Sequence, residues 1–233
     1  MKKIKTILKS SKEIIITYIL NYLIIFILCL FYTLLGYKNL DNFMNTYCLY
    51  ISLIYYIIVI IYLYKKNHRK ELKLPKNKCF PLLYLGISIA VLLNMIIFLI
   101  NPPQPIESSL SPLLILLSSG IIGPIYEEIL FRYLLYNRLK KEFNIKKSII
   151  ITTLIFAIIH LSPIKIIYAF ILGLVLNLIY EKHKNIIAPI LLHIGANSIV
   201  ILLNEYNSYI LLLSIIGIII SIKLNIVDNK NNN

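Results

Sequence analysis

The amino-acid sequence predicts an all-α membrane protein, a polytopic bundle of about eight transmembrane helices with both termini in the cytoplasm. Hydrophobic residues make up 59% of the 233 residues and the mean hydropathy is +0.81, whereas ordinary soluble domains are about 45–50% apolar. Apolar runs close to the roughly 20 residues needed to cross a bilayer follow one another along the chain. Together with the charge pattern described below, these runs exclude a water-soluble globular domain.

Charged, proline-rich and asparagine-rich breaks separate the expected spans. The fifth span is short because Ser162 and Pro163 interrupt it, so a tight hairpin to the sixth span is the simplest interpretation. The expected spans are 14–35, 47–64, 80–100, 112–136, 148–161, 164–180, 186–203 and 209–222.

The net charge of +14 follows the expected topology. All 24 lysines and arginines except Lys38, Lys165 and Arg132 fall in the N-terminal tail, in alternate loops or in the C-terminal tail. Because Lys and Arg are retained on the cytoplasmic side, this pattern predicts a multi-pass protein of the cell membrane with both termini inside. The charge is thereby explained by topology and by attraction to anionic lipid headgroups, and no nucleic-acid partner is expected.

Ionisable side chains inside the expected spans are the candidates for function, because a charge in the bilayer core costs several kcal/mol. Of the ten acidic residues, only Glu127 and Glu128 are embedded. Arg132 follows them on the same helix, and His160 and His193 lie in the fifth and seventh spans.

The embedded residues are expected at similar depths. At 1.5 Å per residue from the nearest cytoplasmic basic residue, Glu127 lies roughly 16 Å deep and His160 roughly 20 Å deep. By the same rise, His193 lies roughly 14 Å deep and Asn197 roughly 20 Å deep. Residues from helices that run in opposite directions therefore meet in one slab near the membrane midplane.

Helical spacing gives the two glutamates different directions. Glu128 and Arg132 are four residues apart and can pair on one face. Glu127 points about 100° away, plausibly toward the bundle interior, where its carboxylate is a candidate general base. A purely structural ion pair is the alternative for Glu128 and Arg132.

The histidine helices carry further polar and aromatic groups at helical spacing. His193 and Asn197 share a face, from which they could donate hydrogen bonds to a developing oxyanion. Phe156 lies one turn before His160, where its ring would limit water access. His160, His193 and Asn197 each also have a structural alternative, as a hydrogen-bonded packing group or an interhelical contact.

The residues that the aspartyl and zinc mechanisms of peptide hydrolysis inside a membrane require are missing from this sequence, and those of a serine mechanism are only weakly represented. An aspartyl mechanism needs two embedded aspartates, but Asp41 and Asp228 lie outside the spans, and the zinc-protease pattern HExxH does not occur. A serine mechanism finds only a weak candidate in Ser118 and Ser119. Of the mechanisms considered, the one that uses a glutamate together with histidines remains.

Three short motifs, in order and each on its own span, resemble the three motifs of the CPBP family, the CAAX proteases and bacteriocin-processing (Abi) intramembrane proteases. The motifs are Glu127-Glu128-x-x-x-Arg132, Phe156-x-x-x-His160 and His193-x-x-x-Asn197. The resemblance covers about residues 110–204, with Tyr133 as a departure where the family usually has glycine.

The resemblance implies a fold division and an activity. Residues 110–204 would form the CAAX protease core, 1–109 three N-terminal transmembrane helices with a basic cytoplasmic loop, and 205–233 the last transmembrane helix and a short cytoplasmic tail. In an intramembrane endopeptidase of this kind, Glu127 and His160 would activate the attacking water. His193 and Asn197 would stabilise the oxyanion, and the embedded ion pair and the phenylalanine would support the site.

These residues are compatible with two mechanisms, one with a metal ion and one without. Glu127, His160 and His193 would make a plausible three-ligand zinc site, as in a metalloprotease. A metal-free mechanism with Glu127 as the base fits the same residues.

The expected substrate is a peptide or membrane-anchored protein cut near the inner leaflet. CAAX-type trimming, peptide-pheromone maturation, bacteriocin maturation and self-immunity are the settings that the resemblance implies, and the sequence does not predict an oligomeric state. Two alternatives use the same polar cluster without proteolysis. One is a non-catalytic membrane scaffold or bacteriocin-immunity protein, and the other is a proton-coupled transporter.

Overall fold

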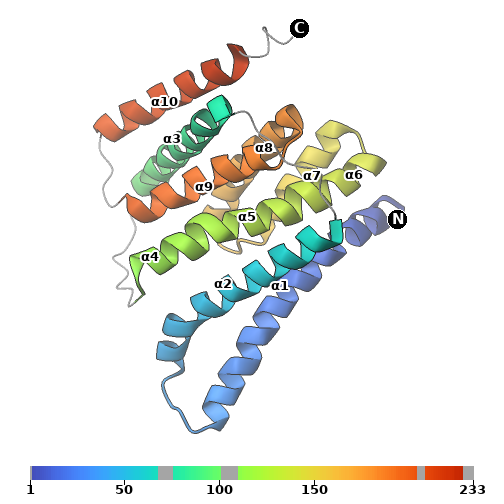
Figure 1. The fold of residues 1–233 in the computed structure, drawn as a ribbon, viewed down its shortest axis with the longest axis vertical. Helices are drawn as coiled ribbons and strands as arrows, with labels where there is room; N and C mark the ends of the chain where they lie inside the picture. The colour runs from blue at the N-terminus through green and yellow to red at the C-terminus, as the bar shows by residue number, and fades with distance from the viewer. Residues whose placement is uncertain (1, 68–75, 101–109, 204–207, 228–233) are drawn as a thin grey trace.

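The protein is helical wherever its structure is described. The structure is a computed structural model that describes residues 2–67, 76–100, 110–203 and 208–227, and within these ranges it contains helices and no strand. The elements, drawn in Figure 1, are α1 (Lys2–Leu34), α2 (Leu40–Asn67), α3 (Lys76–Ile100), α4 (Pro112–Ile115), η1 (Leu116–Ile122), α5 (Gly123–Glu128), η2 (Ile129–Tyr136), α6 (Asn137–Glu142), α7 (Ile145–Ile158), α8 (Pro163–His183), α9 (Ile187–Leu202) and α10 (Ser208–Val227). The expected all-α class is confirmed.

Each expected span coincides with a helix. The five elements from α4 to α6 follow one another without a break and form one helix, Pro112–Glu142, which we call the central helix. Within the described ranges, five helices are long and apolar enough to cross a membrane, while α9 and α10 are apolar but shorter and α7 has 14 residues. These helices are Lys3–Leu34, Tyr47–Lys65, Asn77–Leu99, Pro112–Glu142 and Pro163–His183. A polytopic membrane bundle is therefore confirmed, and the eight crossings stay a prediction.

The tight hairpin between α7 and α8 is present. Helix α7 ends at Ile158, and the chain reverses through Leu161, whose φ of 60° is left-handed. Pro163 then occupies the first turn of α8, where its missing N–H leaves no hydrogen bond unmade.

The basic segments meet at one end of the bundle. Arg138 of α6 pairs with Glu13 of α1 at 2.7 Å, and Lys140 of α6 pairs with Glu181 near the end of α8 at 2.8 Å. In Figure 1 the N-terminus, the end of α6 and the start of α7 lie together. We call this the basic end and the opposite one the far end; the assignment of the basic end to the cytoplasm remains a prediction.

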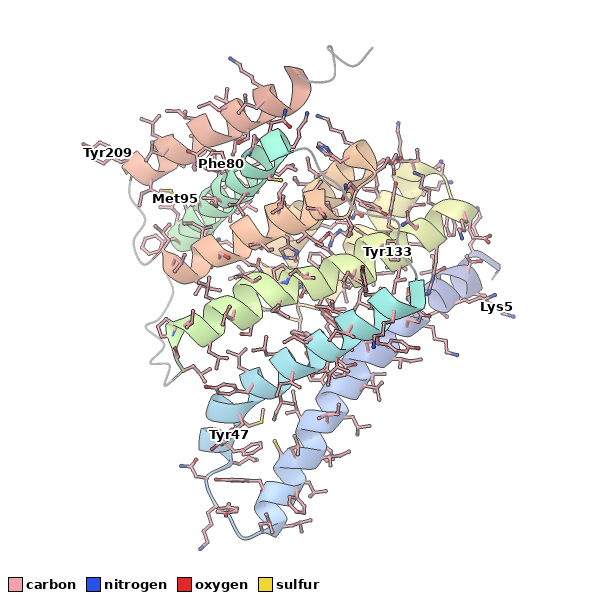
Figure 2. All side chains as sticks on the ribbon, viewed as in Figure 1. Lys5, Tyr47, Phe80, Met95, Tyr133 and Tyr209 are labelled. Atoms are coloured by element: carbon pink, nitrogen blue, oxygen red, sulfur yellow. The ribbon has the colours of Figure 1, made fainter. Side chains whose placement is uncertain are left out.

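The central helix passes between two groups of helices, with α1 and α2 on one side and α9, α3 and α10 on the other (Figure 1). Many of its apolar side chains are fully buried, for example Leu130, Phe131 and Leu135. The outer helices instead expose many isoleucines and leucines, and Figure 2 shows apolar side chains such as Tyr209 directed away from the bundle. An apolar exterior suits lipid as the surrounding solvent.

Helices α3 and α9 approach each other with their backbones in contact. A Cβ atom added at Gly86 would clash with the Leu192 carbonyl group of α9, and one added at Gly195 would clash with the Leu83 carbonyl oxygen of α3. Small residues permit this close packing between membrane helices. The contact fixes the position of α9, which carries His193 and Asn197.

Candidate active site

The central helix carries the two glutamates between its two π-helical segments. Glu127 and Glu128 end α5, η1 precedes α5, and η2 follows with Arg132. A π-helical turn is wider than an α-helical one and often occurs at functional sites. The span expected over residues 112–136 is present, but neither π-helical segment was predicted from the sequence.

Glu128 and Arg132 form the predicted ion pair. The Arg132 Nη1 donates to the Glu128 Oε1 at 2.8 Å, and both side chains are completely buried. The Arg132 Nη2 donates to the Gly173 carbonyl oxygen of α8 at 3.2 Å, and the guanidinium lies 4.5 Å from the centre of the Phe156 ring. The pair thus joins the central helix to α7 and α8.

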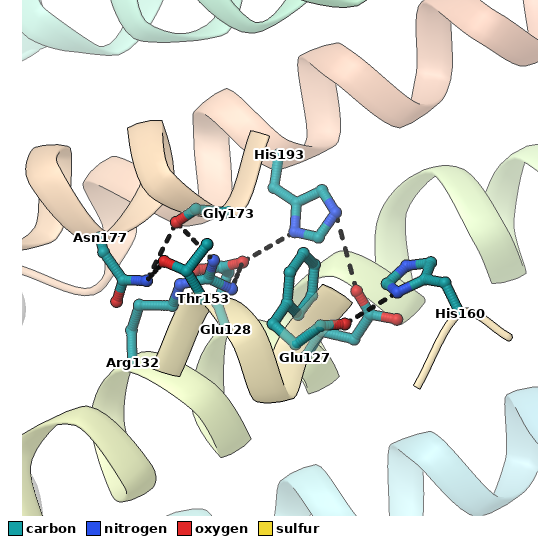
Figure 3. Close-up of polar contacts among 9 residues, drawn as sticks. Glu127, Glu128, Arg132, Thr153, His160, Gly173, Asn177 and His193 are labelled. Atoms are coloured by element: carbon teal, nitrogen blue, oxygen red, sulfur yellow. Dashed lines mark hydrogen bonds and ion pairs between the residues drawn. The ribbon is translucent and has the colours of Figure 1, made fainter. Parts of the chain in front are cut away.

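His193 lies between the two glutamates, as Figure 3 shows. Its Nδ1 is 2.7 Å from the Glu128 Oε1, and its Nε2 is 3.7 Å from the Glu127 Oε2. Because the Glu128 carboxylate also accepts from Arg132, it acts as an acceptor toward the imidazole, and the His193 Nδ1 carries a proton. The ion pair therefore orients His193, a contact that was not predicted from the sequence.

Glu127 faces a different space from Glu128, as helical spacing predicted. Its side chain is 23% exposed, whereas the Glu128 side chain is fully buried. Glu127 lines a cavity, and Glu128 lies behind it. One carboxylate is thus accessible to a small molecule and the other is not.

His160 lies in the turn after α7 rather than inside a span that continues to residue 161. Its Nδ1 is 2.9 Å from the Phe156 carbonyl oxygen, and its ring meets the Phe156 ring edge-on at 5.0 Å. Helix α7 stops at Ile158 because the left-handed Leu161 and the following proline turn the chain into α8. Since a carbonyl oxygen only accepts, the His160 Nδ1 carries the proton and the Nε2 of the neutral ring is a free base.

Asn197 lies one turn after His193 on α9 and contacts the central helix. Its Nδ2 donates to the Ser119 carbonyl oxygen at 3.1 Å. An amide nitrogen carries two hydrogens, so a second one remains for a bound group. Ser118 is buried and donates to the Leu114 carbonyl oxygen, whereas Ser119 lines the cavity.

The four predicted catalytic residues surround one cavity of about 470 Å³. Glu127 comes from the central helix, His160 from the α7–α8 turn, and His193 and Asn197 from α9. Phe156 also lines it, as predicted for the residue one turn before His160. The sequence prediction that these residues meet is confirmed, while their catalytic roles stay predictions.

The cavity extends toward the far end of the bundle, and the expected cut near the inner leaflet stays a prediction. Part of the cavity lining comes from the far-end termini of α3, α8 and α9. The lining residues there are Asn94, Ile97, Ile164, Lys165, Val200 and Ile201.

A buried polar network lies on the basic side of the site. The Asn177 Nδ2 donates to the Thr153 Oγ1 and to the Gly173 carbonyl oxygen, each at 3.0 Å. The same Gly173 carbonyl oxygen accepts from Arg132, and a Cβ atom at Gly173 would stand 2.8 Å from the Phe156 ring. Three helices are therefore packed closely here, and the site is closed toward the basic end.

The suggested zinc ligands do not form a ligand set. In the parts of the chain that the structure describes, no group of three or more His, Cys, Asp or Glu side chains is positioned to hold a metal ion. Both imidazoles use Nδ1 for protein contacts, which leaves one nitrogen each, and Glu127 is the remaining donor.

Part of the chain is similar to known membrane peptidases. Residues 109–199 match the family described as type II CAAX prenyl endopeptidase Rce1-like. The chain is 33% identical over 92 residues to YdiL of Bacillus subtilis (strain 168), whose name describes a membrane peptidase, covering 40% of this chain and 37% of YdiL. It is 28% identical over 185 residues to the membrane-embedded CAAX protease MroQ of Staphylococcus aureus (strain USA300), covering 68% of this chain and 75% of MroQ. No solved structure gives a significant match.

Proposed function

We propose that the chain is an intramembrane endopeptidase of the CPBP family that uses Glu127 to activate water, because residues 109–199 match the Rce1-like family and both relatives are named as membrane peptidases or proteases. The observation that carries the proposal is the cavity that Glu127 shares with His160, His193 and Asn197. A partly exposed carboxylate, a free imidazole nitrogen and two hydrogen-bond donors are the groups that peptide hydrolysis needs.

Water activation falls to Glu127 and His160. Glu127 accepts a proton from the water as its oxygen attacks the carbonyl carbon of the scissile peptide bond. The His160 Nε2 accepts the second hydrogen bond of the same water and so aligns it. The proton held by Glu127 then passes to the leaving amine nitrogen as the C–N bond breaks.

Stabilisation of the oxyanion falls to His193 and Asn197. In its imidazolium form, His193 keeps its Nδ1 hydrogen bond to Glu128 and directs its Nε2–H into the cavity. The second Asn197 amide hydrogen points from the same helix, one turn further on. Donors that are held before the reaction stabilise the developing charge without reorganisation.

The decisive variant is Glu127→Gln, which keeps the size of the side chain and removes the base. We expect it to lower the rate of cleavage by about 10²–10⁴-fold. Mass spectrometry of membrane and secreted peptides from cells with equal amounts of each protein detects the change. A defined peptide terminus present with the wild type should disappear with the variant.

Two controls accompany this comparison. Glu142→Gln changes an exposed glutamate at the end of the central helix and should leave the cleavage pattern intact. Ser119→Ala removes the hydroxyl that a serine mechanism would need and should also be active. If Glu127→Gln kept both the peptide profile and the cellular phenotype, the non-catalytic scaffold or immunity role would replace the protease.

Metal dependence and transport have separate tests. Activity that persists after exhaustive chelation, in protein shown to be metal-free by elemental analysis, supports Glu127 as the base; loss that zinc restores supports the zinc alternative. Proton-driven solute uptake into vesicles that Glu127→Gln abolishes would favour a transporter. MroQ is named as a CAAX protease, and for this chain we propose a peptide or membrane-anchored protein substrate in the cell membrane, with peptide maturation or self-immunity as the setting.

A further inference from the structure

A second cavity lies at the basic end of the bundle, between the start of α1 and α6, which pack against each other (Figure 1). It has a volume of about 460 Å³, and we call it the α1–α6 pocket. It shares no lining residue with the catalytic cavity, so the proposed protease mechanism gives it no role. The charged residues of its lining are Lys9, Lys12, Glu13, Arg138, Lys141 and Glu142.

The α1–α6 pocket has a surplus of positive charge. Its four cations and two carboxylates give a formal net charge of +2. Arg138 is already engaged, because its Nη2 donates to the Glu13 Oε2 at 2.7 Å. The other three cations make no hydrogen bond or ion pair through their ammonium groups with any residue in the described ranges; they are Lys9, Lys12 and Lys141.

Other lysines at the basic end have a different environment. Lys140 and Lys184 both pair with the Glu181 carboxylate near the end of α8. Three ammonium groups that line one small volume without an acidic partner are therefore not a general property of this end. They are suited to bind an anion with several acceptor oxygens.

Ser10 adds a neutral donor to the pocket lining. The residue is only 8% exposed, and its carbonyl oxygen accepts from the Arg138 Nη1 at 3.4 Å. Its hydroxyl makes no hydrogen bond within the part of the chain that the structure describes, whereas the neighbouring Ser11 hydroxyl donates to the Ile7 carbonyl oxygen at 2.9 Å. A hydroxyl beside ammonium groups favours phosphate, whose oxygens accept several hydrogen bonds at once.

The α1–α6 pocket lies where the apolar segments of both helices begin or end. Its lining on α1 stops at Glu13, directly before the expected span 14–35. On the central helix the expected span stops at residue 136, and the lining starts at Arg138. This boundary is the level at which the headgroup phosphates of a bilayer lie.

An apolar stripe on α1 continues from the pocket toward the far end. Ile16, Ile19 and Leu23 are exposed and follow Lys12 by four, seven and eleven residues, which places them on one face of the helix. An acyl chain can pack along this stripe while its phosphate occupies the pocket. A free phosphate ion has no use for the stripe, so the stripe favours a phospholipid.

We propose that the α1–α6 pocket is a binding site for a phosphate group that the headgroup of an anionic phospholipid supplies. The ammonium groups of the three lysines and the Ser10 hydroxyl donate to the phosphate oxygens, and Arg138 keeps its pair with Glu13. The bound lipid joins α1 to the end of the central helix. The site goes beyond the proposed function, because lipid binding here requires neither Glu127 nor proteolysis.

The test is native mass spectrometry of the purified full-length chain in a neutral detergent, titrated with dioleoyl-phosphatidylglycerol. Dioleoyl-phosphatidylcholine has the same acyl chains without the net negative charge, and inorganic phosphate is added as a competitor. The pocket variant combines Lys9→Gln with Lys141→Gln. The matched control combines Lys146→Gln with Lys147→Gln, which removes the same charge from exposed residues at the basic end outside the pocket.

The wild type should bind a single phosphatidylglycerol more tightly than phosphatidylcholine. The pocket variant should raise the Kd for phosphatidylglycerol about tenfold, because each basic side chain near an anionic headgroup contributes to binding. The matched control and Glu127→Gln should keep the Kd of the wild type. Phosphatidylglycerol should also raise the Tm of the wild type and not that of the pocket variant, since a ligand of the folded state stabilises it.

The competitor distinguishes the two sources of phosphate. Inorganic phosphate that fails to displace the lipid supports the phospholipid as the occupant. Displacement by inorganic phosphate that the pocket variant abolishes supports the free ion in the same site. Equal weakening by the pocket variant and the matched control, or equal affinity for phosphatidylcholine, would overturn the inference. The proposed function would stand in that case, because cleavage and its loss in Glu127→Gln are measured separately.

Discussion

Two neighbouring glutamates have different environments in this protein. Glu128 is buried between Arg132 and His193, whereas Glu127 is partly exposed in the cavity. The difference follows from the 100° rotation between consecutive helix residues. One carboxylate can thus hold the site together while its neighbour meets the substrate.

The buried and exposed ion pairs should differ in their contribution to stability. Glu128→Gln leaves the Arg132 charge buried without its partner and should lower the free energy of unfolding by about 3–5 kcal/mol. Glu13→Gln breaks the half-exposed pair with Arg138 and should cost less than about 1 kcal/mol. Thermal unfolding of both variants in the same detergent measures the difference. Equal shifts in Tm would contradict a structural role for the buried pair.

Sequence reasoning predicted the local part of this site and missed the part that depends on packing. The pairing of Glu128 with Arg132 follows from their spacing on one helix. The hydrogen bond from His193 to Glu128 depends on how α9 is rotated against the central helix, which no local pattern specifies. The Asn197 contact was missed for a related reason, since its acceptor is a backbone carbonyl group of Ser119.

At the scale of elements, glycines determine how closely α9 approaches α3. Gly86 and Gly195 lie where the two backbones touch, so neither position has room for a side chain. Because α9 carries His193, this contact also sets the distance between the imidazole and the central helix. Helix packing and site geometry are therefore coupled.

Gly195→Ala should disturb both stability and activity. The added methyl group would overlap the Leu83 carbonyl oxygen, and overpacking of this kind costs about 1–3 kcal/mol. Gly120→Ala is the matched control, because its added methyl group would meet the Leu116 Cδ1 at 3.0 Å, and a leucine side chain can shift. We expect a larger fall in Tm and in cleavage rate for Gly195→Ala. A fall of the same size in both variants would argue against the coupling.

The positions of the elements were predicted better than their internal form. The eight expected spans each have a helix, and the break at Ser162 and Pro163 predicted the hairpin. The π-helical segments on either side of the glutamates have no hydropathy signal, because their residues are as apolar as those of a regular helix. The end of α7 before His160 was also missed, since its apolar pattern continues into the turn.

At the scale of the whole molecule, the cavity and the basic residues lie toward opposite ends. The buried network around Asn177 and Gly173 closes the site on the basic side, and the cavity extends to the far end. If the basic end is cytoplasmic, as the distribution of lysine and arginine predicts, substrate and water enter from the outer side. The sequence could not predict this direction, because depth along a helix does not reveal which side is closed by packing.

Cysteine labelling tests this direction in intact cells. Ser119→Cys, in a chain whose Cys29, Cys48 and Cys79 are replaced by serine, should react with a membrane-impermeant maleimide added outside, because residue 119 is exposed and lines the cavity. A chain that retains only Cys79, near the start of α3, should react only after the membrane is permeabilised. The opposite pattern would reverse the orientation.

The ion pair within the central helix also bears on the biogenesis of the protein. Glu128 and Arg132 are four residues apart, so they can meet as soon as this helix forms and before α8 and α9 have been synthesised. The translocon then receives a segment whose buried acid and base already neutralise each other. Gly173 and His193 join the pair later, as the following helices are inserted. The same contact that supports the finished site thus lowers the barrier to membrane entry for the helix that carries it.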